Sequence, residues 1–187
     1  MVGTVSLVKG IELITQVWPL VAHGGAAELH VYGDSDPKFI QLCEKAGIHF
    51  HGPYREADLP GILAQIDIGV LPSQAPETFC YALSEFFAGG VPVVGSDYGA
   101  LADRIYNGVN GLKVPRDNPQ AWVDALSRLV QDSALREKIA RGVRAPNLLD
   151  QMAARYSALY HEVLTKQRTL ITTQDKTRSE QPVPVGA

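Results

Sequence analysis

The sequence predicts an α/β fold: a single Rossmann-like domain with a parallel sheet flanked by helices. Two observations lead to this prediction. Between residues 2 and 114, short apolar runs alternate with longer patterns of helical periodicity, which is typical of a parallel sheet wrapped by helices. In addition, 45% of the 187 residues are hydrophobic and 20% are charged, a balance that suits a globular protein with a substantial core.

The expected strands and helices alternate along this part of the chain. Strands are expected at residues 2–8, 28–33, 48–52, 66–71, 91–96 and 111–114. Helices are expected at residues 10–22, 36–46, 56–65, 80–88 and 100–106. Proline lacks the backbone N–H that a helix interior needs, so we expect Pro19 to kink or end the first helix.

Beyond residue 118 the pattern becomes purely helical, with helices expected at residues 121–130, 134–142 and 150–167. The last of these has an amphipathic stripe, formed by Met152, Tyr156, Leu159, Tyr160 and Val163. From residue 169 onward the sequence is polar and contains proline, which predicts disorder. The expected organisation is one folded domain at residues 1–168 and a disordered tail at residues 169–187.

Charge and composition argue against several kinds of partner. The net charge of −3 does not favour nucleic acid or an anionic membrane surface. The longest uncharged stretch near the start, residues 13–27, is too short to span a bilayer, so we expect no transmembrane segment. Cys43 and Cys80 have no metal-ligand spacing and no signal peptide precedes them, which indicates reduced cysteines in a cytoplasmic protein.

Two carboxylates in one segment, PETFCYALSEFFAGGVPVVGS, carry the strongest indication of chemistry. Glu77 and Glu85 stand eight residues apart, between two apolar runs. A strand, loop and helix in this order place the helix N-terminus at the carboxyl end of a strand, where backbone N–H groups favour phosphate. Carboxylates beside such a site suit sugar hydroxyls. In a largely helical segment they would lie about 12 Å apart, a reach that suits a nucleotide sugar.

A purely structural explanation of the pair is also open, because glutamate is common on helix surfaces. The helix around Glu85 is apolar over most of its circumference, which predicts that it is buried. Its apolar neighbours are Tyr81, Ala82, Leu83, Phe86 and Phe87. A carboxylate in such a place needs a partner or a ligand, which favours the functional explanation.

This segment resembles the donor-binding signature of retaining glycosyltransferases of the GT-B architecture, in particular the group 1 family (family 4). The similarity extends to VGTVSLVKGIELI near the start, DIGVLPS before Glu77, and SDYGALADRIYNGVNGLKVP after the second apolar run. It covers residues 2–165 in the family's order. It implies the C-terminal, donor-binding half of a two-domain enzyme that transfers a sugar from a nucleotide diphosphate to an acceptor hydroxyl, with no metal and no cofactor.

The resemblance also implies roles for single residues. Glu77 would bind hydroxyls of the transferred sugar, Glu85 would bind the ribose, and Lys9 would neutralise the departing diphosphate. Without the resemblance, Lys9 is a solvated lysine at a helix start. The remaining donor-binding positions, which would shape the loops or direct N–H groups at the phosphates, are Gly10, Thr78, Phe79, Cys80, Tyr81, Ala82 and Gly99.

Two residues depart from the family pattern. Thr4 stands where the family usually has arginine, and Cys80 where it usually has glycine. The chain also resembles only the donor half, so we expect a missing N-terminal acceptor domain, either in a longer protein or as a separate partner subunit. A non-catalytic nucleotide-sugar-binding module and a degenerate interaction domain remain as alternatives. A nucleotide-sugar epimerase or phosphorylase would need catalytic acids or a cofactor lysine that the sequence does not offer.

Overall fold

The computed structural model describes residues 1–23, 25, 27–146 and 149–179. The chain divides into two compact units, Met1–Pro146 and Asn147–Ala187. The sequence predicted one domain that also included the last helix, and the structure differs in placing that helix in a unit of its own.

The first unit contains the predicted parallel strands. They are β1 (His30–Tyr32), β2 (His49–Gly52), β3 (Gly69–Leu71), β4 (Val93–Ser96) and β5 (Gly111–Val114). β1 pairs with β2, and β4 lies between β3 and β5, with every pairing parallel. The α/β class is therefore confirmed, and the last strand has the predicted bounds.

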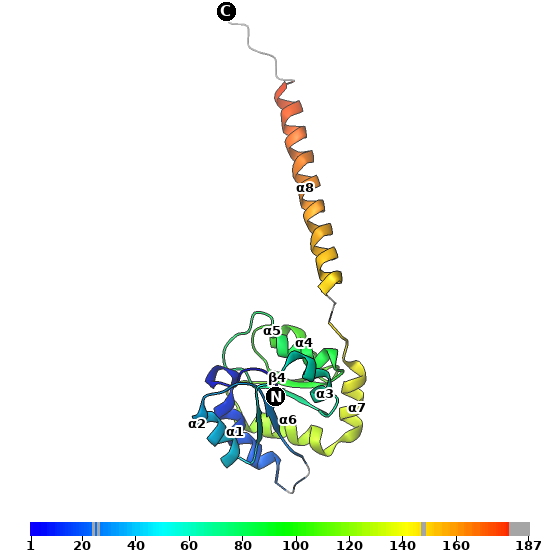
Figure 1. Ribbon diagram of the computed structural model, residues 1–187. Helices are drawn as coiled ribbons and strands as arrows, with labels where there is room; N and C mark the ends of the chain where they lie inside the picture. Colours follow the sequence, from blue (N-terminus) through cyan, green and yellow to red (C-terminus); the bar gives the residue numbers. More distant parts are fainter. Residues whose placement is uncertain (24, 26, 147–148, 180–187) are drawn as a thin grey trace, which may run out of the picture. The chain divides into compact units, whose positions relative to one another are not determined.

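Helices cover both faces of these strands. They are α1 (Ile11–Val21), α2 (Pro37–Lys45), α3 (Leu59–Leu63), α4 (Tyr81–Ala88), α5 (Ala100–Arg104), α6 (Pro119–Gln131) and α7 (Ser133–Gly142), with 3-10 turns η1 (Leu7–Lys9) and η2 (Glu56–Asp58). Figure 1 shows α1, α2 and α6 on one side of the strands and α3, α4 and α5 on the other.

The alternation of side chains along the strands explains this layering. Val70 and Val94 contribute to one buried cluster, whereas their neighbours Leu71 and Val93 contribute to a second. Successive side chains of a strand point to opposite faces, so each face of the sheet has its own apolar core. The fully buried Trp122 of α6 belongs to the first cluster, which α1 and α2 share.

The prediction of a strand at residues 2–8 is wrong over most of its length. This segment makes only isolated parallel bridges, from Val2 to Tyr32 and from Val5 to Ser35, and then enters η1. Gly3 has a φ of 95°, a conformation that interrupts extended backbone. The backbone is extended again at Ser6 and enters η1 at Leu7, which brings Lys9 to the end of β3.

Pro19 lies inside α1, and the helix continues to Val21 rather than ending before it. In an α-helix the N–H of residue 19 would bond to the carbonyl of residue 15, so proline removes one hydrogen bond near the end of this helix.

The second unit contains α8 (Leu149–Ser179). This helix continues beyond residue 169, where the sequence predicted disorder. Residues 169–179 contain neither glycine nor proline, and the first proline of the tail is Pro182, so nothing in this stretch breaks a helix. The remaining residues of the predicted tail, 180–187, lie outside the described residues. Tyr156, Leu159, Tyr160 and Val163 of the predicted stripe are exposed, and no described helix is long and apolar enough to cross a membrane.

Candidate donor-binding site

The turn that carries Lys9 packs against the chain that leaves β3. The N–H of Gln74 donates to the carbonyl of Val8 at 2.8 Å. Gly10 has a φ of 79°, and a Cβ added to it would lie 1.9 Å from the carbonyl oxygen of Pro72. Only glycine fits this approach, so Gly10 fixes Lys9 at the carboxyl end of β3.

Lys9 and Glu77 form an ion pair at this end of the sheet. Lys9 Nζ lies 2.6 Å from Glu77 Oε1, and the hydroxyl of Ser73 donates to the same oxygen at 2.7 Å. The Glu77 side chain is 15% exposed and that of Lys9 is 39% exposed. The carboxylate is thus largely enclosed, while the ammonium remains accessible from solvent.

The surroundings of Glu77 keep its carboxylate ionised. Burial by itself raises the pKa of Glu77, but hydrogen bonds from Lys9 and Ser73, together with the charge of Lys9, outweigh burial. A hydrogen bond from Cys80 acts in the same direction, and the pKa falls below its ordinary value of 4.5. Glu77 is therefore a charged acceptor that the fold holds in place.

Gly99 supports Glu77 from the loop after β4. It has a φ of 56°, and an added Cβ would lie 2.8 Å from both the backbone nitrogen and the carbonyl oxygen of Glu77. The next residue, Ala100, donates its N–H to the carbonyl of Glu77 at 2.8 Å. The loop shape that the sequence suggested for Gly99 consequently bears directly on the position of Glu77.

The residues between Glu77 and α4 form an exposed loop with one buried side chain. Thr78 and Phe79 are exposed, and Tyr81 is 77% exposed. Cys80 is buried and adopts a left-handed conformation, with φ 61° and ψ 86°. This conformation costs a residue other than glycine about 1–2 kcal/mol, which explains why glycine is common at this position in the family that the sequence resembles.

Two further features of the loop bear on its chemistry. Burial raises the pKa of the Cys80 thiol, so the thiol stays protonated and is a poor nucleophile. Ala82, in the first turn of α4, is partly buried and packs against the second core cluster. Its side chain anchors α4, and any contact with a ligand would have to come from its backbone.

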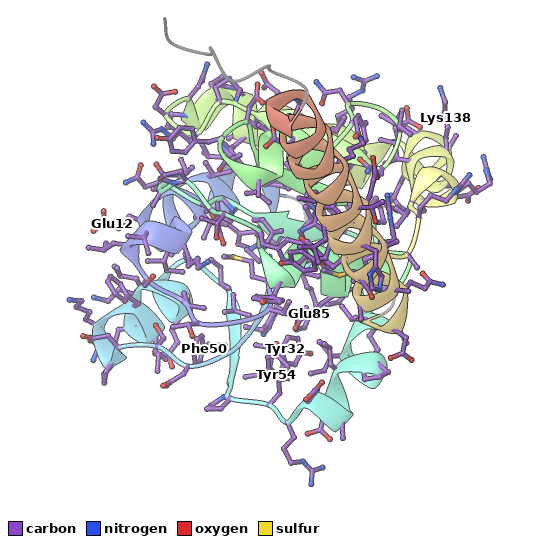
Figure 2. The ribbon with its side chains drawn as sticks, turned by 90° about the horizontal axis from the view of Figure 1, so that it is seen from above. Glu12, Tyr32, Phe50, Tyr54, Glu85 and Lys138 are labelled. Carbon is purple, nitrogen blue, oxygen red and sulfur yellow. The ribbon has the colours of Figure 1, made fainter. Side chains whose placement is uncertain are left out.

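Glu85 lies in α4 in a very different environment. It is partly buried, and within the described residues its carboxylate has no hydrogen-bond partner. Burial and the nearby charge of Glu56 raise its pKa above 4.5. Burial and the charge of Glu85 raise the pKa of Tyr54, and Figure 2 shows Glu85 with Tyr54 and Tyr32 in one part of the molecule.

The comparison with known families identifies the kind of protein to which this site belongs. The family described as Glycosyl transferases group 1 matches residues 1–132. The chain belongs to this family. The GT-B fold and the resemblance to the C-terminal portion, both predicted from the sequence, are confirmed.

Curated relatives match this chain over part of their length. D-inositol 3-phosphate glycosyltransferase of Corynebacterium urealyticum is 37% identical over 126 residues, which are 65% of this chain and 28% of the relative. Phosphatidyl-myo-inositol mannosyltransferase of Mycobacterium leprae is 29% identical over 175 residues, 90% of this chain and 45% of the relative. The chain therefore spans less than half the length of these relatives.

Solved structures share the fold. The C-terminal domain of a group 1 family glycosyl transferase from Francisella tularensis has a TM-score of 0.67 and 24% identity, and the match covers 83% of this chain and 84% of that domain. The HepE protein of Anabaena, solved in complex with UDP, has a TM-score of 0.68 and 21% identity, with 84% and 48% covered.

One geometric expectation for the segment from Glu77 to Glu85 needs correction. α4 begins at Tyr81, so the stretch from Glu77 to Cys80 is not helical. The estimate of about 12 Å between Glu77 and Glu85 assumed a largely helical segment and therefore has no basis in the structure. The loop, with its left-handed residue, sets the separation instead.

The sequence analysis missed two residues that support the loop. Ser73 is 3% exposed and binds Glu77; its place at the end of an apolar run, four residues before Glu77, is a signal that could have indicated this contact. Arg104 at the end of α5 bonds to Phe79, Cys80 and Ser84. No signal in the sequence points to Arg104, because its partners lie on another element.

A cavity of about 450 Å³ lies at the opposite end of the strands, and none of the predicted donor-binding residues lines it. It is bordered by Leu29 and His30 at the start of β1 and by Ile68 just before β3. Ligands of open α/β sheets bind outside the carboxyl ends of the strands, so the candidate site is the one at Lys9 and Glu77. Among the described residues, no group of three or more His, Cys, Asp or Glu could hold a metal ion.

Proposed function

We propose that this chain is the donor-binding domain of a retaining glycosyltransferase. It binds a nucleotide-diphosphate sugar, and the sugar passes to an acceptor hydroxyl with its anomeric configuration kept. The observation that carries this proposal is the ion pair between Lys9 and Glu77 at 2.6 Å, beside the N-terminus of α4. This pair brings a cation for phosphate and an acceptor for hydroxyls to one point.

The diphosphate lies between Lys9 and the start of α4. The Lys9 ammonium is partly exposed and can turn from Glu77 toward the phosphates when the donor binds. The first N–H groups of a helix have no partner within the helix, and the positive end of the helix dipole at this terminus favours an anion. Both groups stabilise the negative charge that grows on the leaving diphosphate.

The two glutamates bind opposite ends of the donor. Glu77 accepts hydrogen bonds from the transferred sugar, and its charge stabilises the positive charge that develops on the ring. Glu85 accepts hydrogen bonds from the ribose hydroxyls. Its carboxylate has the properties expected of such a group, since it is partly buried and lacks a donor of its own among the described residues.

Uracil is the first nucleobase to test, because the similar Anabaena structure holds UDP. This chain matches less than half the length of these curated relatives. We propose that an N-terminal acceptor domain or a partner subunit supplies acceptor binding, and that the reaction takes place in the cytoplasm.

Calorimetric titration of the chain with UDP, GDP and ADP tests the donor-binding function directly. We expect one of the three to bind at a single site with a dissociation constant in the micromolar range, and the matching nucleotide sugar to bind more tightly. Binding should disappear or weaken strongly in Lys9→Met. If none of the three nucleotides binds to the folded chain, the proposed function is wrong.

A second candidate function is a nucleotide-sugar-binding module without catalysis of its own. Thr4 favours it, because this exposed threonine stands where the family usually has an arginine for the phosphates, and arginine binds phosphate with two parallel hydrogen bonds. Release of UDP from a bound UDP-sugar, followed over time in the presence of the acceptor-binding domain or partner subunit, separates the two, because the donor domain alone has no acceptor to which the sugar could pass. Turnover that Glu77→Gln abolishes supports the transferase, and tight binding without turnover supports the module.

A further inference from the structure

Arg104 ties the end of α5 to the loop that precedes α4. Its Nη1 donates to the carbonyl oxygens of Phe79 and Cys80, the latter at 3.3 Å. Its Nη2 donates to the hydroxyl of Ser84 at 2.7 Å. The guanidinium also lies over the ring of Phe79, with Cζ 4.5 Å from the ring centroid. One side chain thus holds both sides of the loop–helix junction.

The residue at this junction has a conformation that its side chain disfavours. Cys80 is the only residue other than glycine with a positive φ in the described part of the chain. Left-handed backbone is easy for glycine and unfavourable for cysteine. Some other contact must therefore hold the peptide groups on either side of Cys80, and Arg104 bonds to the carbonyls of both.

Holding these two carbonyls also sets the direction of two N–H groups. In a trans peptide the C=O and the N–H of the next residue point in opposite directions. The carbonyls of Phe79 and Cys80 face Arg104, so the N–H groups of Cys80 and Tyr81 face away from it. Neither N–H donates a hydrogen bond within the described residues.

We propose that Arg104 is a positioning residue that directs the N–H groups of Cys80 and Tyr81 toward the donor diphosphate. It supplies through hydrogen bonds the loop conformation that glycine at position 80 would adopt by itself. This inference rests on the proposed function for its ligand, but the conformational part concerns the loop alone. Arg104 does not contact the donor and acts through the backbone of the loop.

The first test needs no ligand and uses the two cysteines as reporters. Cys80 is 6% exposed in the second core cluster, and Cys43 is 0% exposed in the first. The alkylation rate of each is measured in the same sample by mass spectrometry of its peptide. We expect Arg104→Ala to raise the rate at Cys80 about tenfold and to leave Cys43 unchanged. Equal increases at both cysteines would show general destabilisation and overturn the proposal.

The second test measures UDP affinity in a double-mutant cycle. We expect Arg104→Ala to weaken UDP binding about tenfold, and the matched change at an exposed arginine of α6, Arg128→Ala, to have no effect. In the background of Cys80→Gly the loss of UDP affinity caused by Arg104→Ala should shrink to about twofold, because glycine adopts the left-handed conformation without the hydrogen bonds from Arg104. An equal loss in both backgrounds would contradict the link between Arg104 and the conformation of Cys80.

The two tests separate the inference from the proposed function. If the wild-type chain does not bind nucleotide but Cys80 alone becomes reactive in Arg104→Ala, Arg104 positions the loop and the proposed function is wrong. If the wild-type chain binds UDP and Arg104→Ala changes neither UDP affinity nor alkylation, the proposed function stands and the role of Arg104 is wrong.

Discussion

Glu77 and Glu85 lie in one short segment, yet their hydrogen bonding and the directions of their pKa shifts are opposite. Glu77 accepts hydrogen bonds from Lys9 and Ser73, and its pKa is lowered. Glu85 has no such partner among the described residues, and burial and Glu56 raise its pKa. One carboxylate is satisfied without a ligand, whereas the other is partly desolvated and unpaired.

The difference between the two carboxylates shows how one segment can combine a group that is already held in place with a group that lacks a partner until a ligand binds. A group that already has its partners is held in the geometry that a reaction needs. An unpaired, partly buried carboxylate lowers the stability of the free protein. The protein regains this stability when a ligand supplies hydrogen-bond donors to the carboxylate. In the function that we propose, the sugar meets the first kind of group and the ribose meets the second.

The largest expected effect comes from removing the cation beside Glu77. Lys9→Met should lower UDP affinity about 30-fold, since a hydrogen bond to a charged group contributes about 2 kcal/mol and the charge of Glu77 then faces the phosphates alone. Calorimetric titration measures the change. Lys138→Met is the matched control, because Lys138 is exposed on α7 and lies well away from Glu85 in Figure 2. An equal loss in both variants would contradict the site.

A pair of isosteric variants sharpens the comparison between the two carboxylates. Glu85→Gln should lower the affinities for UDP and UDP-glucose equally, by about tenfold, since a charged acceptor for the ribose is lost. Glu77→Gln should lower only the affinity for UDP-glucose, because Glu77 binds the sugar. Glu44→Gln, an exposed change on α2, should alter neither. Loss of UDP binding in Glu77→Gln with none in Glu85→Gln would reverse the assigned roles.

The same variants should change stability in opposite directions. Glu77→Gln weakens charged hydrogen bonds to Lys9 and Ser73 and should lower the free energy of unfolding by about 1 kcal/mol, or Tm by about 2–4 °C. Glu85→Gln removes an unpaired charge and should raise the free energy of unfolding by about 0.5 kcal/mol. Thermal unfolding without ligand measures both. A similar decrease in both variants would mean that Glu85 has a stabilising partner in solution.

The layers of the fold were largely predictable from local patterns, because β3 and β4 lie in short apolar runs of the sequence, at residues 66–71 and 91–96, with turn residues nearby. β5 is the clearest case, since residues 111–114 were predicted with the bounds that the structure has. The segment at residues 2–8 was not predictable in this way. Its apolar residues favour a strand, but the chain makes only isolated bridges as far as Val5 and enters η1 at Leu7, and only tertiary contacts decide between the two conformations.

The site was predictable as a region but not as a set of contacts. The segment before Lys9 runs parallel to β1 through isolated bridges and the loop around Glu77 follows β3, so a parallel arrangement of these segments was enough to predict that Lys9 and Glu77 lie in one region. Their direct ion pair, across 68 positions of sequence, depends on the shape of both loops. Arg104 could not be found at all, because a guanidinium that bonds to carbonyl oxygens leaves no pattern in the sequence of its partners.

The smallest effects, in the pH dependence of stability, separate the two carboxylates without any ligand. The pKa of Glu77 lies below 4.5 in the folded chain, so its contribution is present above pH 4.5 and is lost as the pH falls through the folded value. The pKa of Glu85 lies above 4.5. The folded chain then holds this proton more strongly than the unfolded chain, and stability is lost as the pH rises through the folded value.

Denaturant unfolding at closely spaced pH values tests these opposite signs. Glu77→Gln should flatten the loss of stability below pH 4.5 and leave the profile above it unchanged. Glu85→Gln should instead remove a decrease that begins at pH 4.5 and ends above the folded pKa. The slope reports the difference in bound protons between the unfolded and folded states, so each variant should change it in one window only. Changes of the same sign in the same window would mean that the two carboxylates share one environment, and the contrast between a satisfied and an unpaired acid would be lost.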